Sequence, residues 1–312
     1  MREILLTGLA SMILSVSAQG AAASKFNYPF NDAPFKKYAT EATEFHALRS
    51  AGFEKPATEQ SLRRQLELLE IVSKAEPEWI DGYWMRGEAA FQLGNSMTNP
   101  KDIKESRAIF VKGQEATETC LKKAPDNPLC KMFLGASLGK IASIDGIFSS
   151  LRRASVIEGL WLEVVKSGVD YQLNPASSLQ GAARYALGLY YRLVPDSLIL
   201  KMMFGARGDI KKSVAFHKES VEMDGGNSCN LMMLGVSEIC AAKADVKDKL
   251  AQDGLKNLAE AKAKPVTSTL SKTCLADISK IEKDPSMACG YETSRQQEKA
   301  TEEEIKKLNV QR

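Results

Sequence analysis

Side chains that could carry out catalysis are few and widely separated in this sequence. The two histidines are His46, in TEATEFHALRS, and His217, in SVAFHKESVE, and neither has a serine or cysteine nucleophile motif beside it. Nucleophilic catalysis requires a base held within hydrogen-bond reach of the attacking atom, so both are interpreted as ordinary helix histidines. The sequence also has no nucleophile elbow, phosphate loop, dinucleotide loop or His-Glu-x-x-His pattern. It therefore predicts a protein that is not an enzyme and holds no cofactor.

Cysteine is the other reactive residue type. An even number of cysteines is compatible with three disulfides formed in an oxidising compartment, and six buried thiols are the alternative. Metal binding is the least favoured interpretation, because there is no Cys-x-x-Cys and there are only two histidines. The six are Cys120, Cys130, Cys229, Cys240, Cys274 and Cys289.

The N-terminus has the pattern of a secretory signal peptide. One arginine precedes an apolar run from Ile4 to Val16, and small residues at 16–18 and 21–23 satisfy the small-x-small cleavage rule. A membrane anchor is less favoured, because the run is shorter than the ~20 residues of a membrane span. No cysteine lies near the cleavage region to carry a lipid. We expect residues 1–23 to be removed, no transmembrane segment in the mature chain, and a periplasmic or secreted location.

Composition excludes some classes of protein. The chain has 312 residues, of which 44% are hydrophobic and 26% are charged, and this is an ordinary globular composition rather than a disordered one. Its 42 Lys and Arg nearly balance 39 Asp and Glu, giving a net charge of +3. The two signs are interspersed, so the sequence carries no nucleic-acid-binding signature.

A spacing of Pro or Gly followed ten residues later by Gly recurs along the chain. Pro or Gly ends one helix, and about two turns later Gly lets the next helix approach a neighbour closely. Each copy therefore predicts a turn between antiparallel helices. The copies are Pro77 to Gly87, Pro125 to Gly135, Gly225 to Gly235, a thirteen-residue version from Pro175 to Gly188, and Pro265 to Leu275, which lacks the second Gly.

The segments between these turns have helical periodicity. Leu62, Leu66, Leu69 and Val72 share one face, as do Ile157, Leu160, Trp161, Val164 and Val165. Asn127 before Pro128, and Asp209 after GARG, are typical helix caps.

We therefore expect an all-α, α-solenoid fold of α-α repeats with almost no sheet. The repeats should span residues 24–290, lengthened by an insertion at about 143–175 that forms a loop or short helix and then an amphipathic helix. Residues 291–312 should be a charged tail, a frayed helix or disordered, with Glu302 and Lys306 at ion-pair spacing.

The repeats resemble tetratricopeptide repeats. Leu134-Gly135 with Leu138, and Leu187-Gly188 with Tyr191, are similar to the Leu-Gly-x-x-Tyr signature, and Pro77 and Pro125 match the closing proline. The Gly-to-Gly spacing is longer than the family's, so a divergent and closed relative fits better than an open superhelix. The segment from Tyr185 to Gly226 also resembles the T component of TRAP transporters, at Tyr190, Tyr191, Pro195, Gly208 and Asp209. That resemblance implies an exported protein that works beside a solute-binding protein.

The turns also suggest how the cysteines pair. Cys120 and Cys130 flank the Pro125 turn, where antiparallel helices bring such positions together. Cys229 and Cys240 cannot pair on one helix, because eleven residues separate them by ~16 Å along its axis. Cys229 with Cys274, and Cys240 with Cys289, are the pairings we favour.

Aromatic and Met residues on the first helices of the repeats are candidates for a ligand or partner groove on the concave face. Nearby arginines could hold a carboxylate. Core packing is the more common role of such residues. The candidates are Trp84, Arg86, Arg184, Tyr190, Tyr191, Met202, Met203 and Phe204.

Two functions remain open. The first is a non-enzymatic exported protein that binds a protein partner or a small molecule and serves as an accessory to solute uptake. The second is a structural scaffold of the cell envelope. A pocket with aromatics and a converging arginine would favour the first, and a solid Leu and Ala core would favour the second. The Arg207-Gly208-Asp209 tripeptide is interpreted as a turn and a helix cap, not as an adhesion motif.

Overall fold

The fold is described from a computed structural model, which places residues 26–225, 227–266, 268–293 and 295–297. The predicted signal peptide and the Glu302–Lys306 pair lie outside these described residues.

Helices make up most of the described chain, as the sequence predicts, and the strands are two to three residues long. The helices are α1 (Ala33–Lys37), α2 (Ala39–Glu54), α3 (Glu59–Ala75), α4 (Ile80–Ser96), α5 (Ile103–Lys123), α6 (Pro128–Asp145), α7 (Ile147–Ser167), α8 (Leu179–Leu193), α9 (Leu198–Phe204), α10 (Ile210–Met223), α11 (Ser228–Ala241), α12 (Lys249–Lys262) and α13 (Thr269–Lys283). Two 3-10 helices, η1 (Pro100–Asp102) and η2 (Pro285–Cys289), and four strands, β1 (Gln172–Asn174), β2 (Ser177–Ser178), β3 (Tyr291–Glu292) and β4 (Arg295–Gln296), complete the fold.

The predicted turns between helices are confirmed at all five spacing copies. Pro77, Pro125, Pro175, Gly225 and Pro265 each lie between two consecutive helices. The Asn127 side chain accepts hydrogen bonds from the backbone N–H groups at positions 129 and 130, and so caps α6. Asp209 caps α10 in the same way. Each cap satisfies backbone donors that the helix itself cannot pair.

The glycines of the spacing rule lie where helices touch. A side chain at Gly235 of α11 would come within 2.5 Å of the backbone oxygen of Gly254 on α12. A side chain at Gly188 would similarly meet the ring of His217 on α10. These positions keep neighbouring helices at backbone contact, which is the packing role the sequence predicts for them.

The connection at Pro175 is more elaborate than a simple turn. The segment around Pro175 is a short β-hairpin, in which β1 pairs antiparallel with β2, and α8 follows directly. The thirteen-residue interval leaves room for this hairpin, and the Ser178 side chain then caps α8. The predicted loop before α7 is also absent, since Gly146, with a φ of +86°, alone separates α6 from α7.

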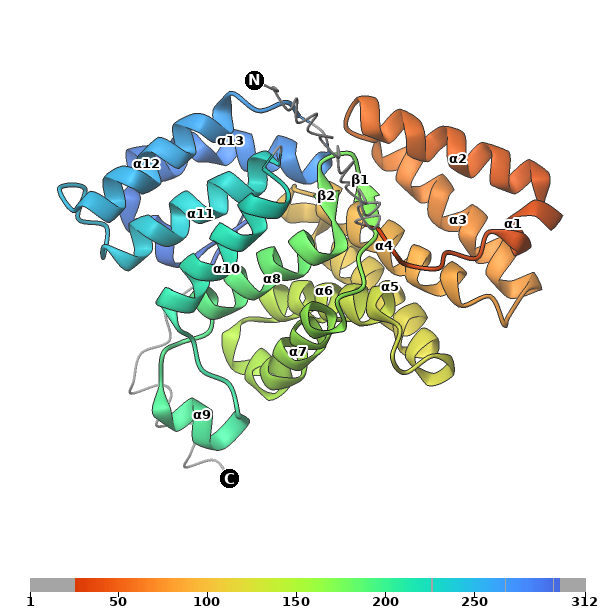
Figure 1. The fold of residues 1–312 in the computed structure, drawn as a ribbon, viewed down its shortest axis with the longest axis horizontal. Helices are drawn as coiled ribbons and strands as arrows, with labels where there is room; N and C mark the ends of the chain where they lie inside the picture. The colour runs from red at the N-terminus through yellow and green to blue at the C-terminus, as the bar shows by residue number, and fades with distance from the viewer. Residues whose placement is uncertain (1–25, 226, 267, 294, 298–312) are drawn as a thin grey trace, which may run out of the picture.

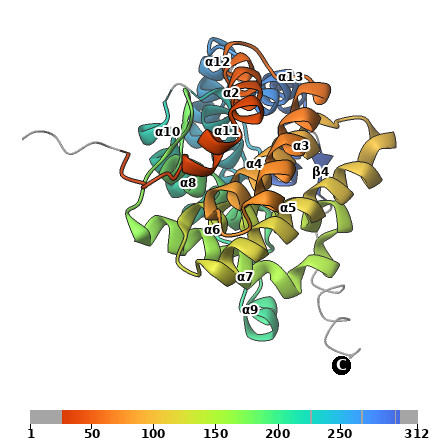
Figure 2. The same cartoon turned by 90° about the vertical axis from the view of Figure 1, so that its right-hand side faces the viewer.

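The helix stack curls back on itself. Figure 1 shows α2 and α3 on one side of the molecule and α12 and α13 on the other, with α6 and α8 between them. The last helix, α13, packs against α4, and in the view of Figure 2 it lies beside the N-terminal helices. The solenoid is therefore closed, and its concave face becomes the interior of a ring.

Arg192 of α8 fastens one part of this ring. It is buried, and it donates a hydrogen bond to the backbone oxygen of Ala288 in η2 at 2.7 Å. Burial lowers the pKa of Arg192 to about 10. A guanidinium that loses solvent in this way must be held by protein acceptors, so Arg192 ties α8 to the segment after α13.

Three disulfides join the six cysteines in the predicted pairs. Cys120 pairs with Cys130 across the α5–α6 turn, Cys229 with Cys274, and Cys240 with Cys289. Their Cα–Cα distances are 6.0, 5.5 and 4.8 Å, within the reach of a disulfide. Three disulfides are compatible with an oxidising compartment. Among the described helices, none is long and apolar enough to cross a membrane.

Candidate binding cavity

The ring encloses a cavity of about 270 Å³. Side chains from α2, α4, α6, α7, α8 and α11 line it, together with residues from the β1–β2 hairpin and β3. This volume lies near the lower end of the range typical of small-molecule sites. The cavity exists because the stack closes, so elements far apart in sequence share its wall.

Most of the wall is apolar. Six of the lining residues carry aromatic rings and six are alanines, and five leucines complete much of the apolar surface. The aromatic members are Phe53, Phe91, Phe133, Trp161, Tyr185 and Tyr190, and the alanines are Ala57, Ala136, Ala142, Ala154, Ala182 and Ala186.

One polar group is the buried ion pair between Arg49 of α2 and Glu88 of α4. Their closest atoms are 3.0 Å apart, and Arg49 also donates to the backbone oxygen of Leu173 at 3.1 Å. Gln92, one turn after Glu88, donates a longer hydrogen bond to it at 3.4 Å. Burial raises the pKa of Glu88 even though Arg49 acts in the opposite direction. This carboxylate is therefore already engaged by protein groups.

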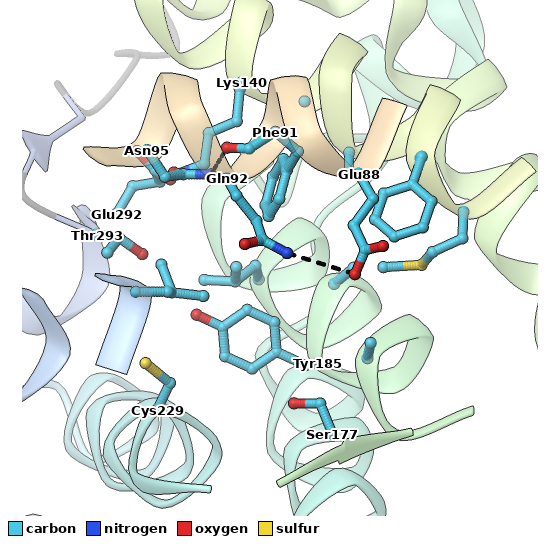
Figure 3. A pocket seen from close by; sticks show the side chains of 18 of the residues that line it. Glu88, Phe91, Gln92, Asn95, Lys140, Ser177, Tyr185, Cys229, Glu292 and Thr293 are labelled. Carbon is cyan, nitrogen blue, oxygen red and sulfur yellow. Dashed lines mark hydrogen bonds and ion pairs between the residues drawn. The ribbon is translucent and has the colours of Figure 1, made fainter. Parts of the chain in front are cut away.

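A second ion pair lies on the other side of the cavity in Figure 3. Lys140 of α6 pairs with Glu292 of β3, and Glu292 also accepts from the Ser143 hydroxyl at 3.1 Å. Glu292 is buried, so two neighbouring donors compensate its charge. The pair also joins α6 to the C-terminal strand and helps close the ring.

The charged groups of the wall balance one another. Arg49 and Lys140 contribute two positive charges, and Glu88 and Glu292 contribute two negative ones, so the described lining residues sum to zero. An ion entering the cavity would lose its hydration without gaining an unmatched counter-charge. The electrostatics therefore favour an uncharged ligand.

The Tyr185 hydroxyl stands out among the polar atoms of the cavity. It is buried near Thr293 but makes no hydrogen bond of standard geometry. Burial raises the pKa of this phenol, so it stays protonated and can donate. In Figure 3 its ring lies below Gln92 of α4, across the cavity. A ligand oxygen or nitrogen placed there could accept a hydrogen bond from this hydroxyl.

Of the eight groove residues predicted from the sequence, Tyr190 lines the cavity. Trp84 is fully buried, and its indole N–H donates to Asp81 at 2.6 Å. Tyr191 is buried and stacks on Phe216, with its hydroxyl donating to Glu158 at 2.5 Å. These two aromatic residues therefore lie within the core.

The predicted arginines and the residues of α9 also lie away from the cavity wall. Arg86 is between α3 and α4, with its Nη1 3.4 Å from the Ser73 hydroxyl. Arg184 forms an ion pair with Glu219. Met202 is strongly exposed, Met203 is half-buried, and Phe204 packs in a small cluster beside α7.

The sequence prediction missed the polar face of α4. Glu88, Gln92 and Asn95 all line the cavity, and they are spaced four and three residues apart. That spacing puts them on one helix face, inside a helix that is otherwise largely buried. Polar residues at this spacing on a buried helix could have indicated the cavity wall from the sequence. Arg49 carried no such signal, because α2 has no clear apolar face.

Neither histidine contributes to the cavity. His46 is exposed on α2, and His217 is fully buried between α10 and α8. Within the described residues, no cluster of three metal-ligating side chains occurs.

Comparisons with known proteins add no relative to this description. No family model and no curated protein matches the chain.

Proposed function

We propose that this protein is a non-enzymatic, exported binding protein that holds a small, uncharged and largely apolar molecule in the cavity of its closed helical ring. The observation that carries the proposal is the wall itself: aromatic rings and alanines surround a space in which every charged side chain is already paired. A scaffold would be expected to fill this interior with leucine and alanine, so the cavity favours ligand binding over the scaffold function.

The chemistry of the wall supports binding rather than catalysis. Glu88 is engaged by Arg49 and Gln92, and the Ser177 hydroxyl accepts from Asn227 at 2.7 Å. No histidine is among the described lining residues. A nucleophile with a free base beside it, which group-transfer chemistry requires, is thus not part of the proposal.

The setting of this function is an oxidising compartment outside the cytoplasm. The three disulfides and the signal-like N-terminal sequence support it. The resemblance of residues 185–226 to the T component of TRAP transporters leads us to propose a role as an accessory to solute uptake, in which the cavity protein works beside a solute-binding partner.

A dye-binding titration tests the cavity. The oxidised protein, freed of bound molecules, is titrated with the uncharged apolar dye N-phenyl-1-naphthylamine, and its fluorescence is followed. We expect saturable binding that Ala136→Leu and Ala186→Leu each weaken by about tenfold, because both side chains line the cavity and the larger residue occupies its volume. The exposed α2 substitution Ala47→Leu is the control. Binding that cavity-filled, folded variants retain unchanged would contradict the proposal.

A second variant tests the polar contact. Tyr185→Phe keeps the ring and removes the buried hydroxyl. It should weaken ligands that carry an alcohol or carbonyl by about two- to tenfold, because one hydrogen bond is lost, and leave pure hydrocarbons unchanged. Isothermal titration with decane-1-ol and with a matched hydrocarbon separates the two cases. An equal effect on both ligands would mean that the hydroxyl takes no part in binding.

A further inference from the structure

The short helix α9 protrudes from the molecule, below α8 and α10 in Figure 1. It is held by a small cluster of its own, in which Leu200 is fully buried against Leu151 of α7, with Ile199 and Phe204 beside them. The inner side of α9 is therefore already used for packing.

The outer side of α9 is apolar as well. Leu198 is 63% exposed and Met202 is 87% exposed, and the two are four residues apart, so they lie on one face of the helix. Met202 is the most exposed of the large hydrophobic residues described. A helix with apolar residues both inward and outward is unusual at a water-exposed surface. Packing within the chain does not account for Leu198 and Met202.

Exposed basic residues lie next to these two in the chain and on the neighbouring helices α7 and α10. Lys201 lies on α9 between them, Lys211 and Lys212 begin α10, and Arg152 is exposed on α7 one residue after Leu151. Nearby negative charge is already engaged, because Asp196 pairs with Arg207 at 2.5 Å and Asp209 caps α10. The exposed side of α9 thus combines two apolar side chains with lysine and arginine on α9 itself and on the helices next to it in the chain.

We propose that α9 docks on an anionic phospholipid surface. Leu198 and Met202 enter the interface between headgroups and acyl chains, while Lys201, Lys211 and Arg152 lie against lipid phosphates. Exposed apolar side chains can be buried in the membrane interface, and the lysines and arginine can be attracted to anionic headgroups.

A second copy of the chain fits this face poorly. Two exposed side chains offer much less than the ~800 Å² per partner that a stable interface buries. In a two-fold dimer the same basic residues would also face their own copies.

Docking through α9 would bring the cavity wall close to the membrane. Leu151, which anchors α9, is also one of the residues that line the cavity. Membrane docking does not depend on the proposed ligand, however, and a protein with a filled cavity should dock equally well.

Vesicle binding tests the proposal. We expect the oxidised protein to co-sediment with phosphatidylglycerol vesicles at low salt, to bind phosphatidylcholine vesicles at least about tenfold more weakly, and to be released as salt is raised. Leu198→Ser with Met202→Ser should weaken binding to the anionic vesicles by about tenfold or more. The control is Ile71→Ser with Val246→Ser, which removes two exposed apolar residues elsewhere.

Two further variants separate charge from fold. Lys201→Glu with Lys211→Glu should abolish anionic-vesicle binding, whereas Lys74→Glu with Lys283→Glu, which makes the same charge change at distant exposed sites, should preserve most of it. Met202→Trp should show a blue-shifted emission on vesicles, because the three native tryptophans are buried and contribute a constant background.

Three outcomes would overturn the proposal. The first is no binding to anionic vesicles at low salt, and the second is equal loss in the α9 variants and their controls. The third is a change of oligomeric mass in Leu198→Ser with Met202→Ser, measured by light scattering, which would assign the face to a second copy. Vesicle binding that survives Ala136→Leu would separate this proposal from the cavity.

Discussion

The two regions of the ring are stabilised in different ways. The N-terminal region, residues 33–206, has a broad core rich in large aromatic residues, among them Trp79, Trp84 and Trp161. The C-terminal region, residues 228–291, has a smaller aliphatic core in which Tyr291 is the one buried aromatic residue described. Its helices are joined by two disulfides across 45 and 49 residues, against a single disulfide across ten residues in the N-terminal region.

A closed ring of helices can thus be built from two regions whose cores differ in size. A small core buries too little apolar area to order its helices strongly. Long-range disulfides compensate by restricting the unfolded chain, and their effect grows with the length of the loop they close. The N-terminal region has enough aromatic packing to hold its shape, so its disulfide spans only a turn.

The largest expected effect comes from removing a long disulfide. Cys229→Ala with Cys274→Ala should lower the free energy of unfolding by about 4 kcal/mol, and Cys120→Ala with Cys130→Ala by about 3 kcal/mol, because the first closes the longer loop. Urea denaturation measures both losses. Hydrogen exchange should then rise mainly in α11–α13 for the first pair. Equal losses, or exchange that rises first in α3–α6, would remove the distinction between the two regions.

The next effect tests the N-terminal region, through Asp81 of α4. This buried carboxylate accepts hydrogen bonds from the Tyr28 hydroxyl at 2.5 Å, the Asn31 backbone at 2.7 Å and the Trp84 indole at 2.6 Å. Asp81→Ala should lower the free energy of unfolding by about 3 kcal/mol, because it leaves buried donors without an acceptor. Asp81→Asn should lose less, and the exposed Asp126→Ala almost nothing. A loss for Asp81→Ala no larger than that for Asp126→Ala would show that aromatic packing alone holds this segment.

A smaller, pH-dependent effect comes from His217, at the junction of the two regions. The ring lies against Gly188 and Tyr185 of α8, and neither ring nitrogen has a hydrogen-bond partner. Burial, and secondarily the charge of Arg192, hold the pKa of His217 well below its usual value. In the unfolded chain His217 becomes protonated near pH 6.5, whereas in the folded chain it stays neutral at that pH. Stability should fall as the pH drops below that point.

The size of this effect follows from proton linkage. Between pH 7 and pH 5 one such histidine contributes a loss of about 2 kcal/mol. His217→Leu should remove that share of the pH slope, whereas His46→Leu, at an exposed position on α2, should change the slope much less. Thermal unfolding at several pH values measures both. An unchanged slope in His217→Leu would mean that the buried ring becomes protonated without unfolding.

Sequence reasoning succeeded where the signal is local. Asn127 with Pro128, and the ten-residue Pro-to-Gly interval, fix a cap and a turn within a few residues. The Cys120–Cys130 disulfide followed from the Pro125 turn, and helix geometry excluded a Cys229–Cys240 pair. The choice between Cys274 and Cys289 as their partners rested on the expectation that the first helices of adjacent repeats run parallel.

The cavity was harder to predict, because it depends on how the stack closes. Whether α13 reaches α4 is decided by the sum of many small packing angles, and no single residue encodes it. Trp84 and Tyr191 were therefore candidates for a groove although core packing is the more common role of such residues, and the structure places them in the core. Glu88, Gln92 and Asn95 could have been found as polar residues on one face of a buried helix, but their partner Arg49 comes from a distant part of the chain.

The smallest expected effect tests whether surface ion pairs contribute to the difference in stabilisation between the two regions. Lys262–Glu282 in the C-terminal region and Arg107–Asp145 in the N-terminal region have similar distances and similar exposure. Solvent screens such pairs, so Lys262→Ala and Arg107→Ala should each lower the free energy of unfolding by less than about 0.5 kcal/mol. If Lys262→Ala alone cost several times more in urea denaturation, ion pairing would have to join the disulfides as a stabiliser of the smaller core. Two equally small losses would leave core size and cross-linking as the difference between the regions.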